Sequence, residues 1–108
     1  MRASGPRDLL AWALGRRMRV RVAGPSMEPS LPDGSTVLVK PGAGADVGDV
    51  VLVRHPTDST LRILKRVDHL TADGRIFLVG DAGASTDSRD FGPVPPERIL
   101  GKVTCTLP

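Results

Sequence analysis

A chain of 108 residues is long enough for one domain with one modest hydrophobic core. Its net charge of +3 suits a nucleic-acid partner, but only 3% of its residues are aromatic, so the side chains that stack on bases are nearly absent. The one cysteine, Cys105, excludes an intramolecular disulfide and has no partners for a metal site. We expect it to be a small buried hydrophobe, and we expect neither metal nor cofactor.

Residues 7–17 predict a short helix, because Pro6 suits a first helical turn and Gly15 followed by arginines suits the last. We divide the chain into this N-terminal helical extension, residues 1–17, and a domain of residues 18–108. The helix is expected to cover the domain or bind a partner, with contact to a membrane surface as the alternative. No apolar stretch approaches the roughly 20 residues of a membrane span, and no cleavable signal is visible. The expected location is therefore cytoplasmic.

The rest of the chain alternates short β-prone runs with turns, in keeping with its twelve glycines and ten prolines. Alternation or β-branched residues predict strands at 18–22, 36–40, 50–54, 61–70, 75–79 and 99–107. Asp73-Gly74 predicts a hairpin between the fourth and fifth of these. Gly80 to Pro96 lacks periodicity and predicts a long loop of the kind that often carries function. The expected fold is mostly β, a small curled antiparallel sheet that resembles a barrel.

The segment Ala-Gly-Pro-Ser-Met-Glu-Pro-Ser-Leu, which begins at Ala23, places Ser26 in a tight turn. Gly24 and Pro25 before the serine, and Pro29 after it, restrict the backbone. Such a turn can hold the hydroxyl outward and leave the Ser26 N–H to stabilise an oxyanion. The alternative is a turn serine without a chemical role.

Lys65 lies between apolar neighbours in the fourth predicted strand. Alternation puts its side chain on the same face as Ile63 and Val67, so it points inward if those two face the core. Burial disfavours the charged amine and lowers the pKa of a lysine from about 10.4. A pKa of about 7–8 suits a general base. The alternative is an edge-strand lysine in water.

The predicted loop gathers acids, hydroxyls and one arginine within a short span. Asp87 and Arg89 are candidates for an ion pair that braces the loop, and Asp81 is a further candidate bracing residue. Ser85 is the candidate to hydrogen-bond the lysine amine and aim it, as a third group orients the base in other triads. The alternative is a solvated acidic turn.

Two histidines offer a Ser-His arrangement instead. His55 precedes Pro56 in an expected turn, and His69 would share a strand face with Lys65. Surface or packing roles are expected for both.

Three segments, in this order, resemble the motif boxes of type I signal peptidases. The run from Gly24 to Leu31 resembles their nucleophile box, and Leu64-Lys65-Arg66-Val67 resembles their lysine box. Gly80-Asp81, followed by Ser85, Asp-Ser-Arg and Phe-Gly-Pro-Val, resembles their C-terminal box. The resemblance covers most of residues 23–103 and implies a mostly antiparallel β domain whose peptide substrate adds as an extended strand.

The resemblance implies that Ser26 is the nucleophile, Lys65 the general base and Ser85 the residue that orients the lysine. Two departures from the family pattern matter. From the sequence we expect neither the N-terminal anchors nor the large inserted β region of these enzymes. It also has Gly24 where some members have a serine that helps to hold the oxyanion, so the oxyanion hole would rest on backbone N–H groups, chiefly that of Ser26.

A minimal version without an anchor resembles one subfamily, the nickel-type superoxide dismutase maturation proteases. The expected substrate is therefore the proform of that dismutase, from which a short N-terminal extension is removed. Two other functions stay open: membrane-associated processing of secreted precursors, with residues 7–17 or a partner as the anchor, and a non-catalytic peptide-binding module. Self-cleaving SOS-response repressors also use Ser and Lys, but they lack the Asp-Ser-Arg box and carry a DNA-binding module.

Overall fold

A computed structural model describes residues 2–3, 15–42, 44–83 and 86–107 of the chain. The helix predicted at 7–17 falls mostly on residues 4–14 and so lies outside the described residues. The described strands and helices are β1 (Arg2–Ala3), β2 (Met18–Arg21), β3 (Thr36–Pro41), β4 (Val50–Arg54), β5 (Arg62–Leu70), β6 (Ile76–Val79), α2 (Ser88–Phe91), the 3₁₀ turn η1 (Pro96–Arg98) and β7 (Ile99–Thr106).

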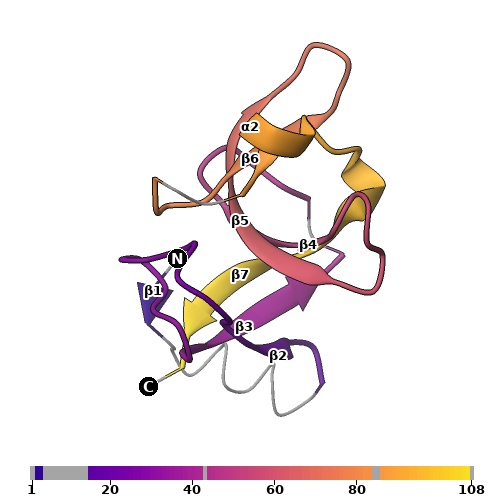
Figure 1. The fold of residues 1–108 in the computed structure, drawn as a ribbon. Coiled ribbons are helices and arrows are strands. Elements are labelled where there is room, and N and C mark those ends of the chain that lie inside the picture. Colours follow the sequence, from indigo (N-terminus) through magenta and orange to yellow (C-terminus); the bar gives the residue numbers. More distant parts are fainter. Residues whose placement is uncertain (1, 4–14, 43, 84–85, 108) are drawn as a thin grey trace.

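The strands form one curled sheet in the order β2-β3-β7-β4-β5-β6, with β1 beside β7 (Figure 1). All neighbours in that order are antiparallel, whereas β1 pairs with β7 in parallel. Within the described residues no pairing joins the outer strands β2 and β6, so the sheet does not close. The mostly-β prediction is confirmed, and the resemblance to a barrel extends only to the curl of the sheet.

The structure differs from the sequence prediction between β6 and β7. The segment predicted as one long loop contains α2, which lies beside β6, and a bridge between Ile76 and Val94 (Figure 1). Backbone hydrogen bonds of 2.8 and 2.9 Å run in both directions between these two residues. A helix of four residues is too short to show a helical period in its sequence, which is why the alternation test missed it.

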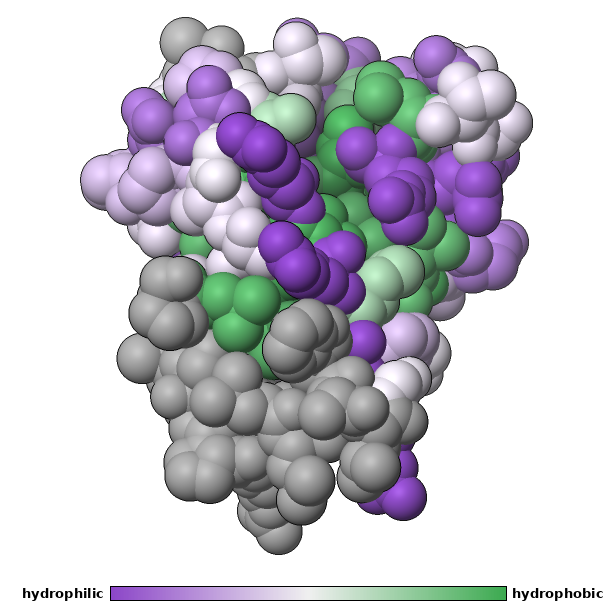
Figure 2. Space-filling model, turned by 90° about the horizontal axis from the view of Figure 1, so that it is seen from below, coloured by the Kyte–Doolittle hydropathy of each residue, from purple (hydrophilic) through white to green (hydrophobic). Residues whose placement is uncertain are grey.

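The core consists of two apolar clusters. Val20, Met27, Leu31, Leu52 and Leu64 belong to the first, among others, and a second cluster contains Val51, Val53, Val67, Ile76, Leu78 and Val94. Because successive strand residues point to opposite faces, β4 and β5 contribute to both clusters. Apolar surface also lies between hydrophilic side chains on the face seen in Figure 2.

Gly101 marks the closest approach of β7 to β3. A Cβ atom at this position would lie 2.5 Å from the Lys40 carbonyl oxygen and 2.7 Å from Cγ1 of Val39. Because one neighbour is backbone, the strain cannot be relieved by rotating a side chain. We expect Gly101→Ala to lower the free energy of unfolding by about 1–3 kcal/mol, as overpacked cores do. Urea denaturation of this variant, beside Gly44→Ala, whose added methyl meets nothing within 4 Å, measures the difference.

Candidate active site

Ser26 lies in a turn that is anchored on both sides by the core. Its neighbour Met27 is 1% exposed, and Leu31 is fully buried and donates its N–H to the Met27 carbonyl at 2.8 Å. Gly24 adopts φ +87°, a conformation that glycine tolerates best, and its N–H donates to Asp33 Oδ1 at 2.9 Å. The turn is therefore held by packing and by a side-chain hydrogen bond, with Ser26 itself half-buried.

The Ser26 turn is joined to the segment after β6. The Ala82 N–H donates to the Ser26 carbonyl oxygen at 3.0 Å. The first and third motif boxes, more than fifty residues apart in sequence, thus meet at the backbone of the candidate nucleophile.

Lys65 is the one lysine among the buried residues and is only 4% exposed. It sits in β5 opposite Val51 of β4, which is fully buried. Burial is the main cause that lowers the pKa of the Lys65 amine. The negative charge of the Asp87 carboxylate raises this pKa, and the positive charge of the Arg89 guanidinium lowers it. The net effect favours the neutral amine, the form that can accept a proton.

Ser26 and Lys65 line the same pocket, which has a volume of about 410 Å³. The wall on one side comes from β2 and the segment that follows it, up to Met27. The other wall comes from Leu61 and the first half of β5, and Thr86 and Phe91 contribute from the third motif box. A hydroxyl and an amine that tends to be neutral therefore face one cavity, an arrangement that can support nucleophilic attack by serine.

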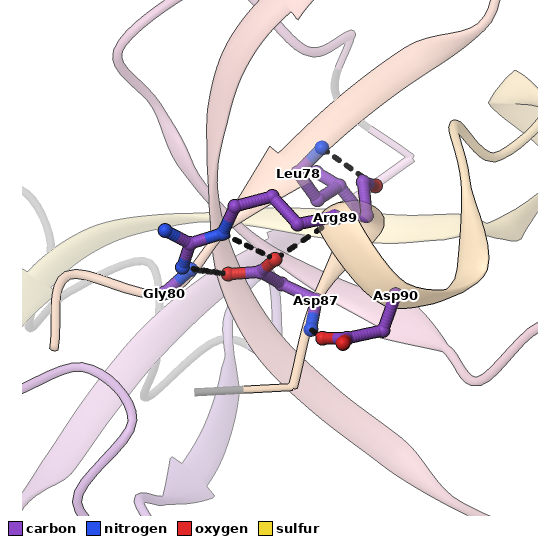
Figure 3. Close-up of polar contacts among 6 residues, drawn as sticks. Leu78, Gly80, Asp87, Arg89 and Asp90 are labelled. Carbon is purple, nitrogen blue, oxygen red and sulfur yellow. Dashed lines mark hydrogen bonds and ion pairs between the residues drawn. The ribbon is translucent and has the colours of Figure 1, made fainter. Parts of the chain in front are cut away.

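Asp87 organises the segment after β6 (Figure 3). Its side chain is fully buried and caps α2 by accepting from the Arg89 N–H at 3.0 Å. It also accepts from the Gly80 N–H at 2.9 Å and from the Arg89 guanidinium at 2.9 and 2.6 Å. The Arg89 hydrogen bonds hold the pKa of the Asp87 carboxyl far below its usual range. In return, Asp90 accepts from the Asp87 N–H, which completes a capping box.

Asp81 binds a residue that the sequence reasoning did not select, Arg66. The guanidinium donates two hydrogen bonds of 2.7 Å to the two Asp81 oxygens and a third, also 2.7 Å, to the Gly48 carbonyl. These bonds lower the pKa of the Asp81 carboxyl. The signal for this pair was present in the lysine box, where an arginine follows the lysine and must point to the opposite face of the strand from it. The pair ties β5 to the segment whose Ala82 N–H holds the Ser26 carbonyl.

We expect Arg66→Gln to destabilise the protein by about 1–3 kcal/mol, since the bidentate bond to a partly buried carboxylate is lost. A double-mutant cycle with Asp81→Asn measures the coupling energy. The exposed pair Arg75 and Asp73 gives the matched control, for which a coupling below about 1 kcal/mol is expected. Equal coupling in both pairs would remove the bracing role of Arg66.

Ser85, predicted to orient the lysine, lies outside the described residues, whereas its neighbour Thr86 lines the pocket. His69 is exposed, its ring stacks on Phe77 with centroids 4.7 Å apart, and it is not among the pocket residues. The expectation that it shares a strand face with Lys65 is wrong, because a register shift between Val67 and His69 breaks the alternation of β5. His55, in contrast, lines the pocket.

Comparison with known proteins agrees with the peptidase-like motifs. A family model described as Peptidase S24-like matches residues 13–103. The mitochondrial ATP-independent inner membrane protease subunit 1a of Arabidopsis thaliana is 39% identical over 108 aligned positions, which cover 75% of this chain and 64% of that protein. The mitochondrial inner membrane protease subunit 1 of Homo sapiens is 32% identical, with 78% and 65% covered, and that of Schizosaccharomyces pombe is 32% identical, with 75% and 67% covered. The chain spans just under two thirds of the length of the first two relatives.

The expected cytoplasmic location is contradicted by these relatives, whose names place them at the mitochondrial inner membrane. The error arose from treating the absence of an apolar span as evidence of location. None of the helices in the described ranges has the length and apolar character needed to cross a bilayer.

Proposed function

Since the chain belongs to the Peptidase S24-like family, we propose that it is a serine endopeptidase that trims precursor polypeptides at a membrane surface. In this proposal Ser26 is the nucleophile and Lys65 is the general base. The observation that carries it is the pocket that holds both residues, with the lysine buried and its pKa lowered by that burial. The membrane setting is inferred from the relatives, which are named as inner membrane proteases.

The reaction follows from the two groups. Neutral Lys65 takes the proton of the Ser26 hydroxyl while Oγ attacks the carbonyl carbon of the scissile peptide bond. The Ser26 N–H stabilises the oxyanion that forms, a role that Gly24 cannot share through a side chain. The protonated lysine then donates its proton to the leaving amine, and the C–N bond breaks. In the second half, Lys65 accepts a proton from water, the resulting hydroxide attacks the acyl-Ser26 ester, and the proton returns to Oγ.

The pair formed by buried Asp87 and exposed Arg89 supports this chemistry through charge. An unpaired carboxylate near Lys65 would hold the amine in its charged form, and the bidentate arginine counters part of that field. Arg66 and Asp81 keep the third motif box against the Ser26 turn. Ser85 is proposed as the group that directs the lysine amine towards Ser26.

The proposed substrates are precursor proteins whose N-terminal segment is removed. The nickel-containing superoxide dismutase proform is the narrower substrate that the resemblance to the maturation proteases implies. The extended segment of such a precursor would lie in the pocket between β2 and β5 and add as a strand.

The experiment incubates the purified chain with two precursors, the dismutase proform and a secreted precursor presented with lipid vesicles, and sequences the new N-termini. We expect cleavage at one site, abolished by Ser26→Ala and unchanged by Ser59→Ala, which alters an exposed loop serine. Cleavage that survives Ser26→Ala would refute the proposed nucleophile. Tight binding of the precursors without any cleavage would favour the peptide-binding module instead.

A further inference from the structure

Two arginines are among the residues that line the pocket. Arg21, from the exposed face of β2, and Arg62, the first residue of β5, both line the cavity. No aspartate or glutamate is among the pocket-lining residues. The charged residues that line the described cavity are therefore all basic.

The Arg62 side chain extends from β5 to β2. Its Nη1 atom lies 3.8 Å from the sulfur of Met18 in β2, although β2 and β5 are not neighbours in the sheet. In the ladder between β4 and β5, Arg62 is directly opposite Arg54. Two like charges in that position repel each other, and the arrangement gains stability when an anion lies beside them. Arg54 itself donates to the Ser59 carbonyl at 2.7 Å.

His55 adds a ring hydrogen-bond donor to the pocket. Its Nδ1 atom is 3.2 Å from the N–H groups of both Thr57 and Asp58, so this nitrogen acts as the acceptor. The ring proton then belongs to Nε2. The acid of this turn, Asp58, accepts from the hydroxyl and the N–H of Thr60. His55 therefore contributes a donor to the pocket without adding a carboxylate to it.

We propose that Arg62 and Arg21, assisted by His55, form a subsite that binds an acidic side chain of the peptide substrate. The inference rests on the proposed function, because the peptide must lie in the pocket that contains Ser26. A peptide is favoured over a lipid headgroup because the arginines line the cavity that holds Ser26 and Lys65. Arg62 is three residues from Lys65 along an extended strand, a span of about 10 Å. The acidic residue is accordingly expected about three residues from the scissile bond.

The test measures binding and cleavage separately. Peptides with Glu or Gln at each of the four positions on either side of the cleavage site are titrated, by fluorescence anisotropy, into the Ser26→Ala protein, which retains the pocket. We expect the best Glu peptide to bind about tenfold more tightly than its Gln counterpart, and this advantage should shrink with salt. Arg62→Gln should abolish the advantage, whereas Arg75→Gln, an exposed arginine in the β5–β6 turn, should preserve it. Arg62→Glu should transfer the preference to a Lys peptide.

In the protein with Ser26 intact, the Glu advantage should appear mainly in KM, and the Gln peptide should still be cleaved. Equal binding of Glu and Gln peptides, or a Glu advantage that persists in Arg62→Gln, would overturn the subsite while leaving the proposed peptidase intact. Binding to anionic vesicles that depends on Arg62, with no preference among peptides, would also overturn it and assign the arginines to lipid. Arg62-dependent Glu binding without cleavage would retain the subsite and refute the peptidase.

Discussion

Replacing Lys65 with methionine should lower the rate of precursor cleavage by about 10²- to 10⁴-fold, the contribution expected of a general base. Methionine fills a similar volume in a position that is 4% exposed but cannot accept a proton. The measurement is kcat/KM for a precursor peptide. Lys40→Met, at an exposed position on β3, is the matched control and should retain full activity.

The same variant should be more stable than the wild-type protein, which separates lost chemistry from lost structure. The lowered pKa of Lys65 means that the unfolded chain binds a proton more readily than the folded chain. The buried amine therefore costs stability below its folded pKa, and this cost fades as the pH rises towards about 10.4. Thermal unfolding should show a higher Tm for Lys65→Met, with the largest gain at acidic and neutral pH. An inactive variant with a lower Tm at every pH would assign Lys65 a structural role.

Replacing Asp87 with alanine should lower the free energy of unfolding by about 2–4 kcal/mol. The change removes a helix cap, which is typically worth about 1 kcal/mol, and leaves the buried Gly80 N–H without its acceptor, at a cost of about 1–3 kcal/mol. Chemical denaturation measures the loss. Glu97→Ala, an exposed carboxylate in η1, should change stability by less than about 0.5 kcal/mol.

Asp87 also predicts how the fold responds to acid. Its folded pKa is depressed, so its contribution to stability is complete above the unfolded value of about 3.9 and is lost as the pH falls through the folded pKa. The stability of the wild-type protein should therefore fall below pH 4 more steeply than that of Asp87→Asn. If the stabilities of the two proteins fell in parallel with pH, the ion pair between Asp87 and Arg89 would contribute little to stability.

The strands were predictable because their signals are local. β4 begins and ends at the predicted residues, and each of the other predicted strands differs from the prediction by one residue at one end. The bulge after Val67 was not predictable, since it depends on how β6 pairs with β5 rather than on the residues of β5 alone. For the same reason the side chain of His69 was assigned to the wrong face.

The site likewise contains residues that the sequence could identify and residues that it could not. Ser26 and Lys65 were selectable because each is chemically unusual in its setting, a serine between prolines and a lysine within an apolar run. Arg66 was missed because an arginine beside an inward-pointing lysine resembles an ordinary solvated residue. The pairing of Arg66 with Val79 between β5 and β6 brings Asp81, two residues further along the chain, within 2.7 Å of the guanidinium. Arg62 was not selected from the sequence either, and only its contact with Met18 of β2 drew attention to it.

The central claim is that Lys65 is neutral when it takes the proton from Ser26. The chain contains only three lysines, so NMR of protein with ¹³C-labelled lysine side chains can follow each amine through a pH titration. We predict that one resonance titrates well below pH 10.4, that Lys65→Met removes this resonance, and that its midpoint coincides with the acidic limb of the kcat/KM profile. A Lys65 resonance that titrates near pH 10.4, the ordinary value for a lysine side chain, beside activity that is already maximal at pH 7, would contradict the account.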